Sequence, residues 1–131
     1  MDYICLYTYT FSKYDNCKKD VDVLKRVTDK GEDYRIDIRS KFEENGQWRH
    51  SYGVRLNIAE FREMTEHMPQ GEHHIIESDD RRIIFEPCGS GKYRLKVQSI
   101  SSKDKEYYLY MSGINRICFN KHKIINATMK A

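Results

Sequence analysis

The sequence predicts an α+β fold in which a curved four-stranded sheet followed by a helix occurs twice. Two observations lead to this prediction. Hydrophobic residues recur at every second position in segments of residues 3–56 and 74–111, which is typical of strands. The period changes to 3.6 after Asn57 and again after Ser112, which is typical of amphipathic helices. The 131 residues are 39% hydrophobic, so the chain can bury a core and is not expected to be disordered.

The strands of the first unit are predicted from alternation and from β-branched and aromatic content. They are expected over residues 3–10, 20–28 and 34–42 and around Val54 and Leu56, with a polar loop at 13–19 and turns at 29–33 and 43–46. The third of these strands is the clearest. Its Ile36 and Ile38 share one face, while charged side chains occupy the other.

A helix is predicted directly after the fourth strand. Asn57 can cap it, and Glu60 stands three residues later, as in a capping box. Pro69 and Gly71 end the helix. Its buried stripe is expected to contain Ile58, Phe61, Met64 and Met68.

The second half repeats this order. Strands are predicted at residues 74–77, 82–86, 93–99 and 107–111, and a helix with Ile114, Ile117, Cys118, Lys121 and Ile125 on one stripe. Residues 34–38 and 93–97 look like equivalent strands, which supports a tandem repeat. We therefore expect units at residues 1–70 and 71–131 that pack together, since either alone would bury little core. The alternative is one continuous domain over residues 1–131.

Several kinds of chemistry are not expected. The four cysteines are scattered and the close pair His73-His74 alternates on a strand, so we predict no metal site, no cofactor and no disulfide framework. Residues 89–92 resemble a phosphate loop only in part and are predicted to form a hairpin turn. Asp79-Asp80 is predicted to be a turn, and we expect no enzyme activity. Without an apolar run or a signal segment, we expect an intracellular protein with no membrane partner.

Charge is distributed unevenly along the chain. Residues 1–70 hold 12 Lys/Arg against 13 Asp/Glu, whereas residues 81–131 hold 11 against 3. The net charge of +3 alone would not indicate a partner. The basic C-terminal stretch predicts that this end of the protein contacts an anionic partner.

Residues 27–68 carry a motif that connects these elements. It runs through Ile36-Asp37-Ile38-Arg39, Phe42, the acidic turn before Trp48, and Gly53-Val54-Arg55-Leu56-Asn57, and ends in Glu60-Phe61. This segment resembles the C-terminal domain of the transcriptional positive-cofactor-four family of single-stranded-DNA-binding coactivators. The resemblance covers about a third of the chain.

The resemblance implies a four-stranded antiparallel sheet and a helix, paired about a two-fold axis, with unpaired DNA bound by the sheet surfaces. Two units in one chain would form an internal pseudo-dimer, and two chains would form a homodimer. The resemblance also implies a nuclear location and partners in the transcription or replication machinery. The function expected from it is largely sequence-independent binding of single-stranded or melted DNA.

Single-strand binding needs cations along a groove and aromatic faces for stacking. Arg35, Arg39 and Lys41 share one face of a strand and could follow a phosphate chain. Trp48 could be an exposed stacking platform or a buried anchor of its loop. The candidate nucleic-acid-binding residues are Lys30, Arg35, Arg39, Lys41, Trp48, Arg49, Arg55, Arg82, Lys92, Arg94, Lys96 and Tyr108.

Two alternatives stay open at the level of sequence. The family's basic loop is replaced here by residues 49–52, which keep one formal charge, and this favours a protein-interaction adaptor with the same fold. The basic C-terminal stretch opposes that interpretation. Similar stacking surfaces also permit RNA binding.

Overall fold

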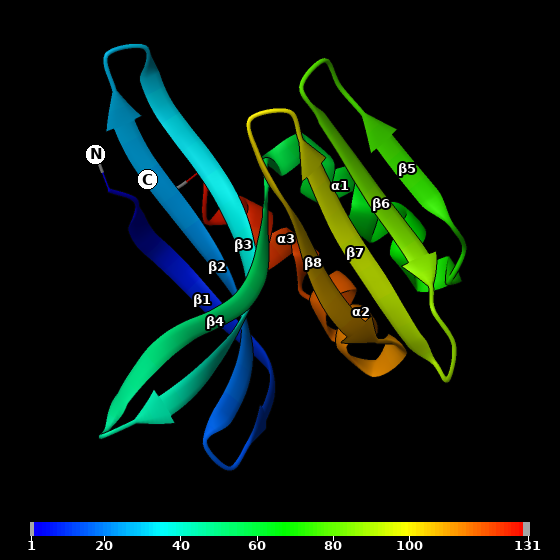
Figure 1. Ribbon diagram of the computed structural model, residues 1–131. Coiled ribbons are helices and arrows are strands. Elements are labelled where there is room, and N and C mark those ends of the chain that lie inside the picture. The colour runs from blue at the N-terminus through cyan, green and yellow to red at the C-terminus, as the bar shows by residue number, and fades with distance from the viewer. Residues whose placement is uncertain (1, 130–131) are drawn as a thin grey trace.

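The computed structural model describes residues 2–129 and contains two four-stranded antiparallel sheets, each followed by helices (Figure 1). The first sheet contains β1 (Ile4–Tyr14), β2 (Cys17–Thr28), β3 (Gly31–Glu44) and β4 (Gln47–Leu56), in that order. It is followed by α1 (Ile58–His67) and the short 3-10 helix η1 (Met68–Gln70). The second sheet contains β5 (His74–Glu77), β6 (Arg81–Pro87), β7 (Lys92–Ser99) and β8 (Ser102–Tyr110), followed by α2 (Met111–Phe119) and α3 (Lys121–Asn126). The predicted α+β class and the two similar units are confirmed.

The predicted loop at residues 13–19 is wrong. β1 continues to Tyr14 and β2 begins at Cys17, with a two-residue turn in which Asp15 has a positive φ of 47°. The β7–β8 hairpin likewise extends further than expected, since β8 begins at Ser102. These hairpin ends project beyond the core, so both faces meet solvent and no hydrophobic alternation marks them as strands.

The predicted start of α1 is confirmed in atomic detail. The Glu60 backbone N–H donates to Asn57 Oδ1 at 2.8 Å, and the Asn57 N–H donates to Glu60 Oε1 at 2.8 Å, which completes the capping box. Phe61, Met64 and Met68 of the predicted stripe are fully buried. The helix predicted for the second unit is divided at Asn120 into α2 and α3.

One hydrophobic core joins both units, with Ile36 and Ile38 from the first sheet and Leu95 from the second. The inter-unit contacts are reciprocal, because α1 contacts β5 and α2 contacts β1. In the second of these contacts, a Cβ added to Gly113 would lie only 3.2 Å from Phe11, so this position favours glycine. Reciprocal contacts are a property of isologous two-fold interfaces. They support the interpretation of the chain as a pseudo-dimer.

The two units correspond in topology, with an offset in sequence. β3 and β7, which carry the segments 34–38 and 93–97, are both third strands of their sheets. Leu56 and Leu109, each two residues before its helix begins, pair with Ile36 and Tyr93. When the two units are aligned by these strand pairings, Ile36 is equivalent to Tyr93. This equivalence differs by two residues from the one that the segments 34–38 and 93–97 give in the sequence.

Candidate nucleic-acid interface

Alternate side chains of each sheet point away from the helices and form an outer face. On β3 these are Arg35, Asp37, Arg39 and Lys41, and on β2 they include Asp20 and Asp22. The three basic side chains share a face, as predicted. The register also sets Asp20 opposite Arg39 and Asp22 opposite Asp37, so the outer face of the first sheet is a mixture of both charges.

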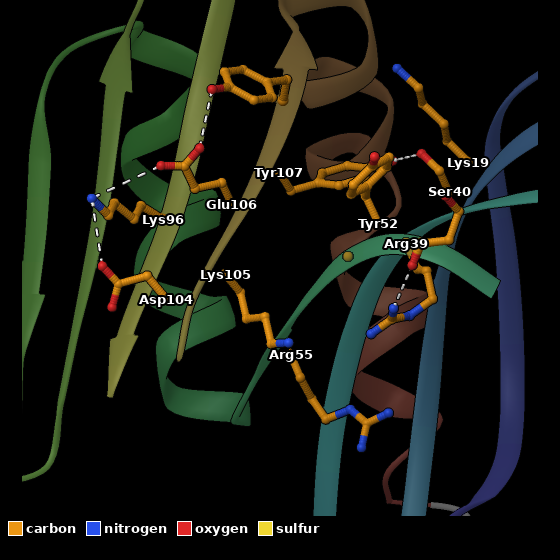
Figure 2. A pocket seen from close by; sticks show the side chains of 13 residues that line it. Lys19, Arg39, Ser40, Tyr52, Arg55, Lys96, Asp104, Lys105, Glu106 and Tyr107 are labelled. Carbon is orange, nitrogen blue, oxygen red and sulfur yellow. Dashed lines mark hydrogen bonds and ion pairs between the residues drawn. The ribbon is translucent and has the colours of Figure 1, made fainter. Parts of the chain in front are cut away.

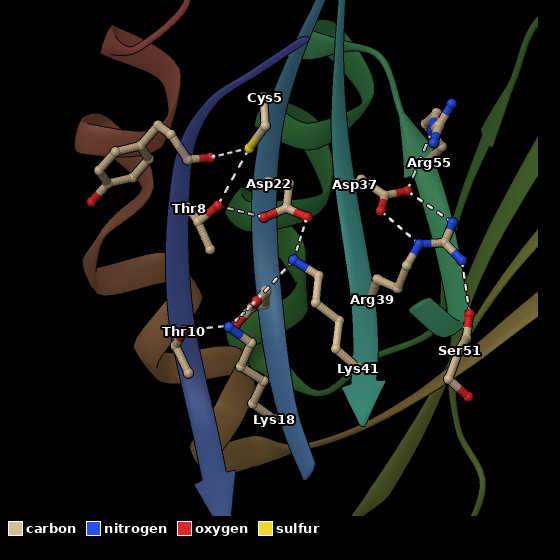
Figure 3. A network of polar contacts seen from close by, with 12 residues as sticks. Cys5, Thr8, Thr10, Lys18, Asp22, Asp37, Arg39, Lys41, Ser51 and Arg55 are labelled. Atoms are coloured by element: carbon tan, nitrogen blue, oxygen red, sulfur yellow. Dashed lines mark hydrogen bonds and ion pairs between the residues drawn. The ribbon is translucent and has the colours of Figure 1, made fainter. Parts of the chain in front are cut away.

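Lys41 lies within this mixture as a buried cation (Figure 3). Its Nζ lies 2.9 Å from Asp20 Oδ2 and 2.8 Å from Asp22 Oδ2, and only 9% of the residue is exposed. Burial lowers the pKa of Lys41, but its hydrogen bonds to Asp22 and Asp20 outweigh burial, and the net shift is upward. Thr8 and Thr10 donate to the same two carboxylates. Lys41 is therefore occupied by the network and does not face a ligand.

Asp37 holds two arginines side by side. Its carboxylate accepts from Arg39 Nε at 2.7 Å and from Arg55 Nε at 3.3 Å, and it is 1% exposed (Figure 3). Arg39 also donates to the Ser51 carbonyl at 2.8 Å. A guanidinium has five N–H donors, so Arg55, whose side chain is 41% exposed, keeps donors for a further anion.

These arginines border a groove of about 860 Å³ between the two sheets, where the edge strands β4 and β8 contact one another (Figure 2). The groove is lined by Lys19, Arg39, Ser40, Ser51, Tyr52, Gly53, Arg55, Lys96, Asp104, Lys105, Glu106, Tyr107 and Tyr108. Five of these side chains are cationic, two are acidic and three are tyrosines. The lining comes from both units, so neither unit forms the groove alone.

Tyr107 and Ser40 close the floor of the groove. The Tyr107 hydroxyl reaches from β8 to Ser40 Oγ on β3 at 2.9 Å (Figure 2). Burial raises the pKa of Tyr107 to about 12, although the hydrogen bond with Ser40 opposes the shift. The phenol is therefore neutral at pH 7 and ties the two sheets together.

The walls of the groove offer unpaired cations and exposed aromatic rings. Neither Lys19 nor Lys105 forms an ion pair within residues 2–129. Tyr52 is 78% exposed, and Tyr108 is also exposed. Lys96 makes only long contacts to the two acidic side chains, at 3.7 and 3.9 Å. The groove can therefore neutralise phosphates and stack bases.

The structure brings four of the predicted residues into the groove: Arg39, Arg55, Lys96 and Tyr108. The other predicted residues lie outside its lining: Lys30, Arg35, Lys41, Trp48, Arg49, Arg82, Lys92 and Arg94. Lys92 contacts a residue of the lining, with its Nζ 4.5 Å from the centroid of the Tyr108 ring.

Most predicted cations outside the groove are paired with carboxylates. Arg35 contacts Asp33 at 3.0 Å, Arg82 contacts Glu77 at 2.6 Å, and Arg94 contacts Glu86 at 2.8 Å. Arg49 lies 3.8 Å from Glu44, and Lys30 is in the exposed turn between β2 and β3. The outer sheet faces are therefore largely charge-compensated.

Trp48 lies near the end of the β3–β4 hairpin and is half-buried. Lys18 Nζ lies 4.6 Å and Lys13 Nζ 5.9 Å from the centroid of its ring. These contacts are cation–π interactions across the outer face of the sheet. The ring is neither fully exposed nor fully buried, so Trp48 matches neither the exposed stacking platform nor the buried loop anchor that the sequence left open.

Sequence reasoning missed Lys19, Tyr52, Lys105 and Tyr107. Lys19 and Lys105 fell in segments predicted to lie outside strands, and Tyr52 in the loop before the fourth strand. The contact between β4 and β8 brings them together, and no spacing in the sequence encodes that contact. The alternation of Tyr107 and Leu109, continued backwards by one step, would have placed Lys105 on a strand.

Within residues 2–129, no helix has the length and apolar character needed to cross a membrane. The same part of the chain contains no cluster of three or more His, Cys, Asp or Glu side chains suited to hold a metal ion. A scan against protein-family models gives no match, and a search of the curated proteins finds none either. The groove and the residues that line it are therefore the features of the chain that indicate its function.

Proposed function

We propose that the protein binds single-stranded DNA in the groove between β4 and β8, without catalysis and with little sequence preference. One observation carries the proposal: Lys19 and Lys105 are unpaired within residues 2–129 and share the groove with exposed Tyr52 and Tyr108. The resemblance of residues 27–68 to the positive-cofactor-four family supports DNA as the ligand. It also supports a role in transcription or DNA replication, in the nucleus.

The chemistry of binding follows from the groove's side chains. Lysine and arginine release counterions when they neutralise phosphates, while each base stacked on an aromatic ring contributes about 1–3 kcal/mol. Asp37 holds Arg39 and Arg55 in place before a ligand arrives, which reduces the entropy lost on binding. None of these contacts reads a base edge, so little sequence preference is expected.

The proposal is tested by fluorescence anisotropy with a labelled oligo-dT strand. The double variant Lys19→Glu/Lys105→Glu is expected to lower affinity about tenfold or more and to reduce the log–log salt slope by about 1.4. Tyr52→Ala is expected to lower affinity about tenfold, whereas Tyr52→Phe should retain it, because stacking needs the ring and not the hydroxyl.

Lys30→Glu is the control, since it reverses one charge, half the change of the double variant, on an exposed turn outside the groove. Its affinity is expected to stay close to that of the wild type. Equal losses for Lys30→Glu and the groove variant would contradict the groove as the site. Binding that does not weaken between about 50 and 200 mM salt would contradict phosphate contacts altogether.

A protein-interaction adaptor is the second candidate, and the paired cations Arg35, Arg82 and Arg94 favour it, since their charge is already neutralised. RNA is the remaining alternative ligand. Single-stranded DNA, duplex DNA and RNA of equal length in one gel-shift series distinguish the three. The adaptor is favoured only if none of them binds.

We also infer that the pseudo-dimer is complete within one chain. Light scattering is then expected to give the mass of a single chain, 15.7 kDa. A mass of twice that value would favour the homodimer instead.

A further inference from the structure

In the structure, the excess of basic residues in the C-terminal half lies in its helices and not in its sheet. Residues 71–110, which contain the second sheet and its turns, hold 7 Lys/Arg against 7 Asp/Glu and are electrically balanced. The excess lies in the helices that follow. Residues 111–129 hold Arg116, Lys121 and Lys123 and no acidic residue.

These three cations and the exposed residues around them on both helices form what we call the α2–α3 surface. None of the three forms an ion pair within the chain from Asp2 to Met129. Asn115, Arg116, Phe119, His122, Lys123 and Asn126 are exposed, and Phe119 is 88% exposed. Unlike the outer face of either sheet, this surface carries charge of one sign only.

Lys121 and Lys123 of the α2–α3 surface lie outside the lining of the groove, whereas Arg116 lines a small pocket together with the groove residue Lys19. The helices cover the sheet faces that carry Ile36 and Leu95, and alternation directs Arg39 and Lys96 of the same strands the other way. In Figure 1 the helices lie behind the two sheets. A ligand held by Lys121 and Lys123 would therefore use other cations than a ligand in the groove.

We propose that the α2–α3 surface binds the phosphate backbone of duplex nucleic acid. A surface with cations and no acid is complementary to a polyanion. The exposed amides of Asn115 and Asn126 are further donors to phosphate oxygens. Lysine is depleted in protein–protein interfaces, so Lys121 and Lys123 favour nucleic acid over a protein partner.

Together with the proposed single-strand groove, a duplex site on α2 and α3 would let one molecule hold unpaired and paired DNA at once. This last step depends on the proposed function, whereas the duplex site itself does not. Such a bridge fits a protein that acts where a duplex is melted. In such a complex the basic residues of α2 and α3 would bind the duplex, and the groove would bind the displaced strand.

The duplex site is tested by anisotropy with a labelled duplex whose two ends are closed by non-nucleotide linkers, so that it neither frays nor presents an unpaired loop. Lys121→Glu/Lys123→Glu is expected to lower duplex affinity about tenfold or more and to leave oligo-dT affinity unchanged. Arg116 is kept intact, because its Nη1 also donates to the Phe11 carbonyl at 2.8 Å.

Arg62→Glu is the control, since it reverses one charge, half the change of the lysine variant, at a side chain exposed on α1 of the first unit. Its duplex affinity is expected to equal that of the wild type. Unchanged duplex affinity in the Lys121→Glu/Lys123→Glu variant would overturn the site. A loss in Phe119→Ala as large as in the lysine variant would also overturn it, since a backbone contact does not need an apolar ring.

The variants distinguish failure of the single-strand groove from failure of the duplex site. Lys19→Glu/Lys105→Glu is expected to lose oligo-dT and keep the duplex, the reverse of the helix variant. Saturating unlabelled oligo-dT is expected to leave the labelled duplex bound, which shows a ternary complex. Displacement of the duplex by oligo-dT would overturn the second site while leaving the groove proposal standing.

Discussion

The buried carboxylates of Asp20, Asp22 and Asp37 lie on a sheet face that the sequence pattern would assign to solvent; they are 0%, 3% and 1% exposed. Each is neutralised by a basic side chain of the same face. A buried charge is costly unless it is paired and hydrogen-bonded. Several basic side chains of the outer sheet face therefore neutralise these buried carboxylates, and only some of the basic residues remain free to bind a ligand.

Lys41→Ala would leave Asp20 short of its closest cation and Asp22 without one. Removal of one partner of a buried ion pair costs about 3–5 kcal/mol, and we expect a loss of stability of that size. Urea unfolding followed by far-UV circular dichroism measures it. Lys13→Ala, an exposed lysine near Trp48, is the control and should change stability by about 0.5 kcal/mol or less. Similar losses in both would contradict the network.

Tyr107 gives the molecule a pH dependence at alkaline values. Its pKa is raised to about 12 in the folded protein, against the ordinary value of 10.0, so folding favours the neutral phenol. Between those values the unfolded state releases the proton first, and stability falls as pH rises.

The stability lost through Tyr107 is expected to reach at most about 3 kcal/mol, since one pKa unit corresponds to about 1.4 kcal/mol. Tyr107→Phe cannot ionise, and its urea midpoint should fall less steeply over the same range. Identical pH profiles for the two proteins would contradict the buried hydroxyl. The other tyrosines titrate in both, so only the difference between profiles counts.

Helix α1 depends at its first turn on the capping box. Asn57→Ala removes one of its two hydrogen bonds and is expected to destabilise the protein by about 1 kcal/mol. Differential scanning calorimetry measures the change as a lower Tm. Asn115→Ala on the exposed side of α2 is the control, and it should leave Tm unchanged or slightly higher because alanine is the better helix former.

Some helices and strands could be predicted from the sequence pattern and others could not. The capping box and the strand at residues 34–42 were predictable because their signals are local and the core reinforces them. The extended hairpin ends were not, since residues 13–19 meet solvent on both faces and carry no alternation. The break at Asn120 was missed because the apolar stripe from Ile114 to Ile125 continues across it.

The whole molecule unfolds as one unit if the core is shared, as its packing indicates. Phe85 lies in the second sheet and is fully buried, whereas Trp48 lies in the first. Phe85→Ala is expected to cost about 3–5 kcal/mol and to lower the urea midpoint reported by Trp48 fluorescence as much as that reported by circular dichroism. A Trp48 signal that keeps the wild-type midpoint would show that the two units unfold separately.

The sequence by itself determined the order of strands and helices, the repeat and the helix cap, because alternation, turn residues and capping depend on near neighbours. It also determined that cations alternate with core residues. Only the tertiary structure decided which of those cations are free. The packing of β4 against β8 forms the groove and the Ser40–Tyr107 contact, and ion pairs across neighbouring strands occupy Lys41 and Arg94. The β4–β8 packing and the Ser40–Tyr107 contact join residues far apart in the chain, and the ion pairs depend on the exact register of neighbouring strands, so composition and spacing could not reveal them.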